Sequence, residues 1–264
     1  MTITESMSGS ARIESPAAGD AWLIPDWPAP ARVRAAVSTR HGPGISPVPF
    51  ERFNLGARNG DAPAAVEHNR RAVQTAWALP HPPHWLQQVH GTAVVAIDER
   101  ASTSEPRADA AWTATPGQPL AILTADCLPV LFCAADGSVV AAAHAGWRGL
   151  AAGVLEATLS VMPAAGAPPL AWLGPCIGAR SYEVGEEVHA AFVDRDAGAA
   201  EHFVATRSGH WLCDLAGLAR RRLRQAGLTQ IYGGGFDMLT DSRFYSYRRD
   251  AARSGRFASL IWLV

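Results

Sequence analysis

The hydrophobic and polar positions along the chain predict strands that alternate with amphipathic helices. Short apolar runs predict buried strands at 32–39, 92–97, 119–134, 138–147, 169–174 and 257–264. Apolar residues at helical spacing predict helices at 63–78, 149–162, 183–193 and 214–227. The segment 40–56 is rich in Gly and Pro, which predicts a loop after the first strand.

Capping and turn residues indicate how these elements connect. Asp61 and Asp214 stand where helix N-caps are expected, and Gly227 follows the last helix. Asp136-Gly137 lies between two apolar runs and is a strong hairpin signal. If the runs pair around it, opposed residues have numbers that add up to about 273. Strands, helices and a hairpin together predict one α/β domain with a mixed sheet, spanning 21–264 after a poorly ordered tail at 1–20.

Composition and charge exclude several classes of protein. Of 264 residues, 48% are hydrophobic and 18% are charged, which supports a folded core and excludes a disordered chain. A net charge of −1 favours neither nucleic acid nor a membrane surface as a partner. The N-terminus lacks a basic segment followed by an apolar one, so we expect no signal peptide. Four cysteines without a C-x-x-C pair favour a reducing, cytoplasmic location.

Candidate chemistry lies where two strands of the predicted hairpin end. Cys127 follows one apolar run, and His144 ends the other in the stretch "HAGWRG". The hairpin register places the two side chains one diagonal step apart, provided that Pro129 does not break the pairing. A histidine beside a cysteine activates a nucleophile, but both are also zinc ligands. His90 offers a third ligand, and three ligands with an open fourth position are typical of a catalytic zinc.

Plainer interpretations of the same residues stay open. Cysteine is among the most often buried residues, and a histidine at a strand end is often structural. Trp147 is expected to pack, and Arg148 to lie on the surface. However, "VHG", "ADC" and "HAGWRG" each place a ligand-capable residue beside small residues at the boundary of an element. There the backbone can approach a ligand closely.

Several motifs resemble one family closely: "QVHGTAV", "ADAAWTATPG", "TADCLPVLF", "AAHAGWRGL", "GPCIGARSYEVG" and "FYSYRRD" followed by "GRFASLIWL". They are similar to the YfiH-type family, also called laccase-domain proteins, from about residue 33 to the C-terminus. The resemblance implies an α/β sandwich and one zinc site at His90, Cys127 and His144. It also implies purine nucleoside phosphorylase, adenosine deaminase and methylthioadenosine phosphorylase activity. The alternative that it implies is peptidoglycan editing, in which serine is removed from a wrongly built cell-wall precursor. One departure is the stretch before "FYSYRR", which lacks the "CT" pair that many members carry.

The remaining expectations concern the substrate and the metal. Phosphorolysis of a nucleoside needs an anion site, for which Arg40, Arg148 and Arg248 are candidates. Asn54 is a candidate for contacting the ribose. Asp126 is expected either to carry a proton or to orient a histidine.

A multicopper oxidase is disfavoured by the histidine count. It would use roughly ten histidines, whereas the chain has nine in total and no H-x-H pair. Copper can still replace zinc at a single Cys/His site. A non-catalytic metal-binding scaffold and a metal-free Cys–His hydrolase remain as alternatives.

Overall fold

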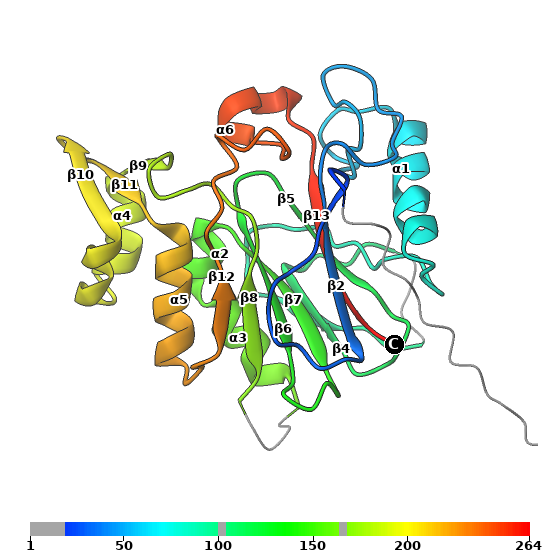
Figure 1. The fold of residues 1–264 in the computed structure, drawn as a ribbon. Helices are drawn as coiled ribbons and strands as arrows, with labels where there is room; N and C mark the ends of the chain where they lie inside the picture. Colours follow the sequence, from blue (N-terminus) through cyan, green and yellow to red (C-terminus); the bar gives the residue numbers. More distant parts are fainter. Residues whose placement is uncertain (1–18, 100–103, 164–167) are drawn as a thin grey trace, which may run out of the picture.

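The computed structural model describes residues 19–99, 104–163 and 168–264 and builds them around two large sheets (Figure 1). The larger sheet has the order β12 (Ile231–Gly233), β8 (Leu170–Leu173), β6 (Leu128–Cys133), β7 (Val140–Ala145), β4 (Ala110–Thr113), β3 (Val94–Ala96). The second sheet has the order β1 (Trp22–Leu23), β2 (Val33–Ser38), β13 (Phe257–Leu263), β5 (Leu120–Thr124). Parallel pairs at β12–β8 and β3–β4 combine with antiparallel pairs, so the predicted mixed sheet is confirmed.

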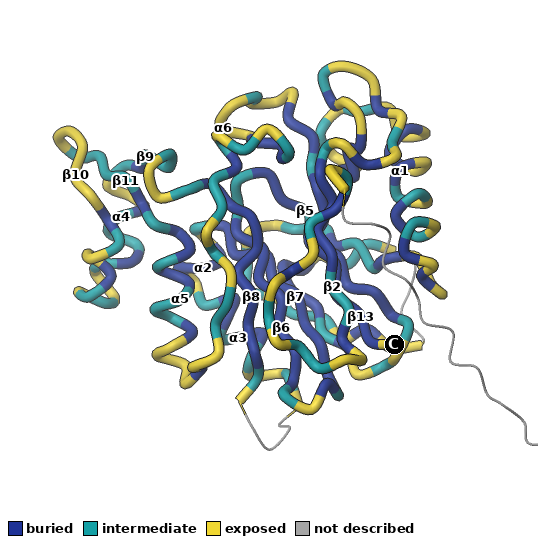
Figure 2. Tube along the Cα trace, in the orientation of Figure 1, coloured by how far each residue is buried: buried dark blue, intermediate teal, exposed yellow. Residues whose placement is uncertain are grey.

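The two sheets pack face to face, and helices cover their outer faces. Along β13, Phe257 and Ile261 pack between the sheets, whereas Leu260 and Trp262 pack outward. Both faces of this strand are therefore buried, which explains its uninterrupted apolar run. The helix α1 (Pro63–Ala76) covers the outer face of the second sheet. The helices α2 (Trp147–Ala152), α3 (Val154–Val161) and α5 (Leu215–Gln225) cover the larger sheet. Figure 2 shows the buried strands in the middle of this α/β sandwich.

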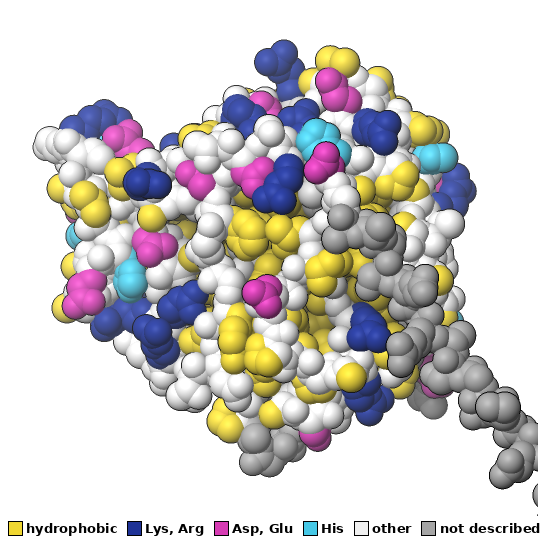
Figure 3. All heavy atoms as spheres, in the orientation of Figure 1, with side chains coloured by type: hydrophobic (Ala, Val, Ile, Leu, Met, Phe, Trp, Pro, Cys, Tyr) yellow, Lys and Arg dark blue, Asp and Glu magenta, His cyan; other side chains and the backbone are white. Residues whose placement is uncertain are grey.

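A small third sheet and short helices complete the described chain. The order of the small sheet is β10 (Phe203–Arg207), β11 (His210–Cys213), β9 (Glu183–Gly185), and α4 (Glu186–Val193) and a 3-10 turn (Ala197–His202) lie beside it. The helix α6 (Tyr247–Asp250) and a second 3-10 turn (Ala251–Arg253) precede β13. The described part of the chain contains no helix with the length and apolarity that a bilayer crossing needs. On the face drawn in Figure 3, basic and acidic side chains are interspersed, in keeping with a net charge near zero.

The predicted hairpin has the predicted register. Leu128 faces Ala145 and Pro129 faces His144 across β6 and β7, so Pro129 does not break the pairing. The predicted N-cap at Asp214 is confirmed, because its carboxylate accepts the Gly217 amide at 2.8 Å. The expected tail at 1–20 lies almost wholly outside the described residues.

Three element boundaries and one cap differ from the prediction. The run 119–134 forms two strands in different sheets, because the backbone turns at Asp126 with φ of 83°. The segment 149–162 contains two helices, which Gly153 separates with φ of 104°. The start of 183–193 is the strand β9. Ala62, not Asp61, is the N-cap of α1, because Asp61 bonds to the adjacent loop instead. Burial on both faces hides such breaks from hydrophobic periodicity.

Candidate metal centre

Three separate elements bring His90, Cys127 and His144 together at one end of the larger sheet. His90 lies in the loop before β3, Cys127 immediately precedes β6, and His144 is part of β7. Their ligand atoms all lie within 4.8 Å of one another. Sγ of Cys127 is 3.8 Å from Nε2 of His90, and the two imidazole rings meet edge to face at 4.8 Å. The predicted grouping of the three side chains is therefore present.

Asp109, which precedes β4, orients two of these ligands. Its Oδ1 lies 2.8 Å from Nδ1 of His144, so Nε2 of that ring is left for the cluster. The same carboxylate accepts the backbone amides of Val89, His90 and Gly91 at 3.1, 2.9 and 2.7 Å. One buried side chain thus fixes a ring on β7 and the loop that carries His90.

Gly146 leaves the space in which the three ligands meet. A Cβ atom there would lie 2.9 Å from Cδ2 of His90 and 3.0 Å from Sγ of Cys127. Its φ of −62° suits any residue, so the need for glycine is steric. The second glycine of "HAGWRG", Gly149, lies against Gly91: a Cβ would be 2.9 Å from the Gly91 carbonyl oxygen. The motif therefore packs closely on the loop of His90.

The cluster favours a charged thiolate. Burial raises the pKa of the Cys127 thiol, but the charge and hydrogen bond of His144, together with His90, lower it from 9.0 to about 6. Burial likewise lowers the pKa of His144, but Cys127 and Asp109 outweigh this and raise it to about 9. Two imidazole nitrogens and one thiolate, with one ring held by a carboxylate, are a donor set that suits zinc or copper. The residues present therefore fit a single metal ion.

The ligands open into a cavity of about 540 Å³. Four arginines and one carboxylate line it, together with polar and aromatic side chains. The lining residues are Gly56, Ala57, Arg58, Asn59, Leu86, Gln88, His90, Leu123, Thr124, Ala125, Asp126, Cys127, His144, Trp147, Arg148, Ile177, Tyr182, Tyr247, Arg248 and Arg256. The excess of guanidinium groups makes the cavity attractive to anions.

Asp126 lines the cavity but does not orient a histidine, a role that belongs to Asp109. Its Oδ2 accepts the backbone amide of Arg248 at 2.5 Å, whereas its Oδ1 is buried and has no hydrogen-bond partner among the residues that the structure describes. Burial raises the pKa of this carboxyl, although hydrogen bonds from Ser246 and Arg248 act in the opposite direction. A carboxyl that retains its proton to higher pH beside a ligand cluster is suited to proton transfer.

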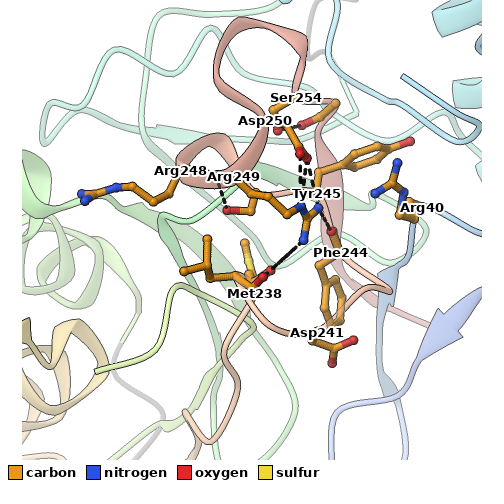
Figure 4. A network of polar contacts seen from close by, with 12 residues as sticks. Arg40, Met238, Asp241, Phe244, Tyr245, Arg248, Arg249, Asp250 and Ser254 are labelled. Carbon is orange, nitrogen blue, oxygen red and sulfur yellow. Dashed lines mark hydrogen bonds and ion pairs between the residues drawn. The ribbon is translucent and has the colours of Figure 1, made fainter. Parts of the chain in front are cut away.

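Two of the three predicted phosphate-binding arginines line the cavity. Arg148 is exposed and stacks on Trp147 at 4.2 Å, and Arg248 donates to the Glu183 carbonyl oxygen at 3.1 Å. Arg40 does not line the cavity: its guanidinium lies 5.1 Å from the ring centroid of Tyr245. Figure 4 shows Arg40 and Arg248 extending to opposite sides of the loop between them. Arg40 follows β2, whereas Arg248 belongs to α6, and the tertiary structure does not bring the two guanidinium groups to the same cavity.

Asn54 is buried beneath the cavity rather than exposed to it. Its side chain bonds to Gly56, Asn59, Asp61 and the amide of Arg256. These contacts use its donor and acceptor atoms, which leaves the ribose contact without geometric support. Instead, Asn54 fixes two residues of the cavity wall, Asn59 and Arg256.

Sequence reasoning missed Asp109 and Arg256. Asp109 stands directly before an apolar strand in "ADAAW", much as Asp126 precedes Cys127 in "ADC". That repeated pattern was the available signal. Arg256 gives no comparable signal, because it stands in the loop directly before the apolar strand β13 and belongs to no periodic pattern. Trp147, expected to pack, is half-buried against the core beneath α2 and also lines the cavity.

Comparison with known proteins agrees with this architecture. A family model described as multi-copper polyphenol oxidoreductase laccase matches residues 34–264. A purine nucleoside phosphorylase of Pseudomonas aeruginosa is 54% identical over 246 residues, covering 92% of this chain and 99% of the relative. The purine nucleoside phosphorylase YfiH of Escherichia coli is 49% identical over 243 residues, covering 92% of this chain and 98% of the relative.

Solved structures show the same fold. A Neisseria meningitidis protein, described as belonging to DUF152, superposes with a TM-score of 0.87 at 45% identity, covering 92% of this chain and 99% of that one. The hypothetical protein YfiH of Bacillus licheniformis superposes with a TM-score of 0.84 at 27% identity, covering 96% and 98% of the two chains. The likeness extends over the whole described architecture.

Proposed function

Because the chain belongs to the YfiH-type family, described as multi-copper polyphenol oxidoreductase laccase, we propose that it is a zinc-dependent purine nucleoside phosphorylase. The observation that carries the proposal is a cavity that combines the His90, Cys127 and His144 cluster with several guanidinium groups that form no ion pair among the described residues. Curated relatives of 54% and 49% identity bear the name of this activity. The substrates are accordingly small molecules: a purine nucleoside and phosphate.

Phosphorolysis exchanges one bond for another at the sugar. A phosphate oxygen bonds to C1′ of the ribose, the bond from C1′ to the purine nitrogen breaks, and the purine takes the electron pair and a proton. Guanidinium groups of Arg148 and Arg248 bind and orient phosphate through paired hydrogen bonds. The Asp126 carboxyl, which lines the cavity and has a raised pKa, holds a proton and passes it to the departing base.

A metal ion fits the same site. His90, Cys127 and His144 would hold it, and it would supply Lewis acidity next to the substrate. Two imidazoles and one thiolate favour zinc, and copper binds such ligands even more tightly, so it can replace zinc. Three donors leave room for one ion, which is a simpler site than the family description implies.

Adenosine deamination is a second activity that one observation favours. In this hydrolysis a water oxygen bonds to the purine carbon that carries the amino group, the bond from that carbon to nitrogen breaks, and the nitrogen leaves as ammonia after it receives a proton. The Asp126 carboxyl lines the cavity that holds the ligand cluster, and burial raises its pKa. Methylthioadenosine phosphorolysis breaks the same kind of bond as the main reaction and needs no further group.

We also propose that residues 21–264 form one catalytic domain that acts in the cytoplasm. All four cysteines are free thiols, which supports a reducing compartment.

The proposed function is tested with inosine, adenosine and phosphate. We expect hypoxanthine from inosine only when phosphate is present, and ammonia from adenosine with or without it. Cys127→Ala should lose bound zinc and turnover together. Full turnover by the metal-free variant, or hypoxanthine release at an equal rate without phosphate, would overturn the mechanism. Serine release from a serine-containing cell-wall precursor, without nucleoside turnover, would instead support peptidoglycan editing.

A further inference from the structure

Arg256 is held more firmly than the other arginines of the cavity. Its backbone amide donates to Oδ1 of Asn54 at 2.8 Å. Its Nη1 donates to the carbonyl oxygens of Ser254 and Gly255, each at 2.9 Å. Its side-chain stem passes so close to Gly56 that a Cβ at that position would lie 2.7 Å from Cγ of Arg256. The guanidinium is therefore fixed before any ligand binds, which lowers the entropy cost of binding.

Part of this guanidinium has no partner. Among the hydrogen bonds and ion pairs of the described residues, Nε and Nη2 of Arg256 donate to nothing, and no carboxylate pairs with the side chain. These two nitrogens form the edge of arginine that matches two oxygens of a phosphate or carboxylate. Arg58 differs, because its Nη1 is 2.6 Å from Oε2 of Glu105. Arg148 differs as well, because it is exposed and rests on Trp147.

The position of Arg256 also places it deep in the cavity. It lines the same cavity as Asp126 and Cys127, and burial lowers the pKa of its guanidinium while the charges of Cys127, Asp126 and Tyr247 raise it. Its guanidinium is 5.8 Å from the ring centroid of Tyr247. An anion bound to Arg256 would thus share one cavity with the ligand cluster and Tyr247.

We propose that Arg256 is the residue that binds the phosphate co-substrate, through Nε and Nη2, while Arg148 and Arg248 assist from exposed positions. The inference rests on the proposed function for the identity of the anion. It assigns to Asn54 and Gly56 the role of positioning residues, which act on phosphate through Arg256.

The test compares Arg256→Gln with Arg256→Lys and the matched control Arg253→Gln, which is exposed and does not line the cavity. Two lost hydrogen bonds to a charged group predict a KM for phosphate that rises about 10- to 100-fold in Arg256→Gln. The KM for inosine and the zinc content should stay at wild-type values. Arg256→Lys should restore little of the phosphate affinity, because an ammonium group lacks the two parallel N–H donors of a guanidinium. An unchanged KM for phosphate in Arg256→Gln would overturn the proposal.

A second variant leaves the charge in place. Gly56→Ala adds a methyl group that displaces the Arg256 side chain, so the KM for phosphate should rise while the KM for inosine changes less. Wild-type kinetics in a folded Gly56→Ala variant would contradict the assigned position of Arg256.

Equilibrium binding separates this inference from the proposed function. Inorganic phosphate is titrated into the zinc-loaded wild type and Arg256→Gln by calorimetry. If the wild type lacks phosphorolysis, the proposed function fails, but loss of phosphate binding in Arg256→Gln would still support the anion site. Equal phosphate binding by both proteins, or binding by neither, would overturn the inference.

Discussion

Nδ1 of His144 lies 2.8 Å from Oδ1 of Asp109, and that carboxylate also accepts three amides of the loop that carries His90. The relationship joins two candidate metal ligands that are far apart in sequence. It also fixes which nitrogen of His144 is available to a metal ion.

Asp109→Asn should weaken the metal site. The amide cannot accept as strongly from the His144 ring and also from three backbone amides. Loss of such an orienting carboxylate typically lowers metal affinity about 10- to 100-fold. Zinc affinity is measured by competition with a chromogenic chelator. Asp194→Asn, at an exposed position, is the control, and equal affinities in the two variants would contradict the role of Asp109.

Gly146→Ala should abolish metal binding while the protein still folds. The new methyl group would lie 2.9 Å from His90 and 3.0 Å from Cys127, so the ligands would be pushed apart. Gly185→Ala is the matched control, because a Cβ there meets nothing within 4 Å. Zinc content after dialysis and circular dichroism check both variants. Full zinc content in Gly146→Ala would show that the ligands do not converge as described.

The ionised carboxylate of Glu105 should stabilise the protein in a pH-dependent way. Burial raises the pKa of this carboxyl, but hydrogen bonds and charges from Arg70 and Arg58 outweigh burial and hold the pKa below its usual 4.5. A lowered pKa gives a stabilising contribution that is present above 4.5 and is lost as the pH falls through the folded-state value. Glu105→Gln should therefore cost about 1 kcal/mol at pH 7.

Urea denaturation of both proteins at several pH values tests this prediction. The difference in the free energy of unfolding should shrink below pH 4.5. A difference that stays constant or grows as the pH falls would contradict the pairing of Glu105 with the two arginines.

Replacement of Arg249 should lower the stability of the protein and leave the candidate metal ligands in place. Its Nη2 donates to the Phe244 carbonyl oxygen at 2.9 Å, and its Nε lies 3.1 Å from Oδ1 of Asp250 (Figure 4). Weaker contacts of 3.4 Å reach the carbonyl oxygens of Met238 and Leu239. Arg249→Met should lower the free energy of unfolding by about 1–3 kcal/mol.

Arg253→Met is the matched control for this loop, since Arg253 is exposed. Denaturation midpoints and slopes of both variants are compared with the wild type. Equal stability of Arg249→Met and Arg253→Met would show that the loop does not depend on the Arg249 contacts.

The sequence alone determined the hairpin and its chemistry. Asp136-Gly137 between two apolar runs fixes a two-strand register, and that register places Cys127 near His144, because opposed positions follow directly from a short turn. The helix that Asp214 begins was predictable for a similar reason: its cap bonds to residues three positions along the chain. Both features depend on neighbours in sequence.

Tertiary structure alone decided the rest of the cavity. Asp109 and Arg256 reach the site through contacts across sheets and loops, and no periodicity records those contacts. Asn54 is polar and stands two residues before Gly56, so it resembled a ligand contact, yet packing turned it into a buried support for Arg256. The break at Asp126 was hidden because both flanking strands are apolar on both faces. Local rules predict local geometry, whereas long-range packing determines which side chains face a common cavity.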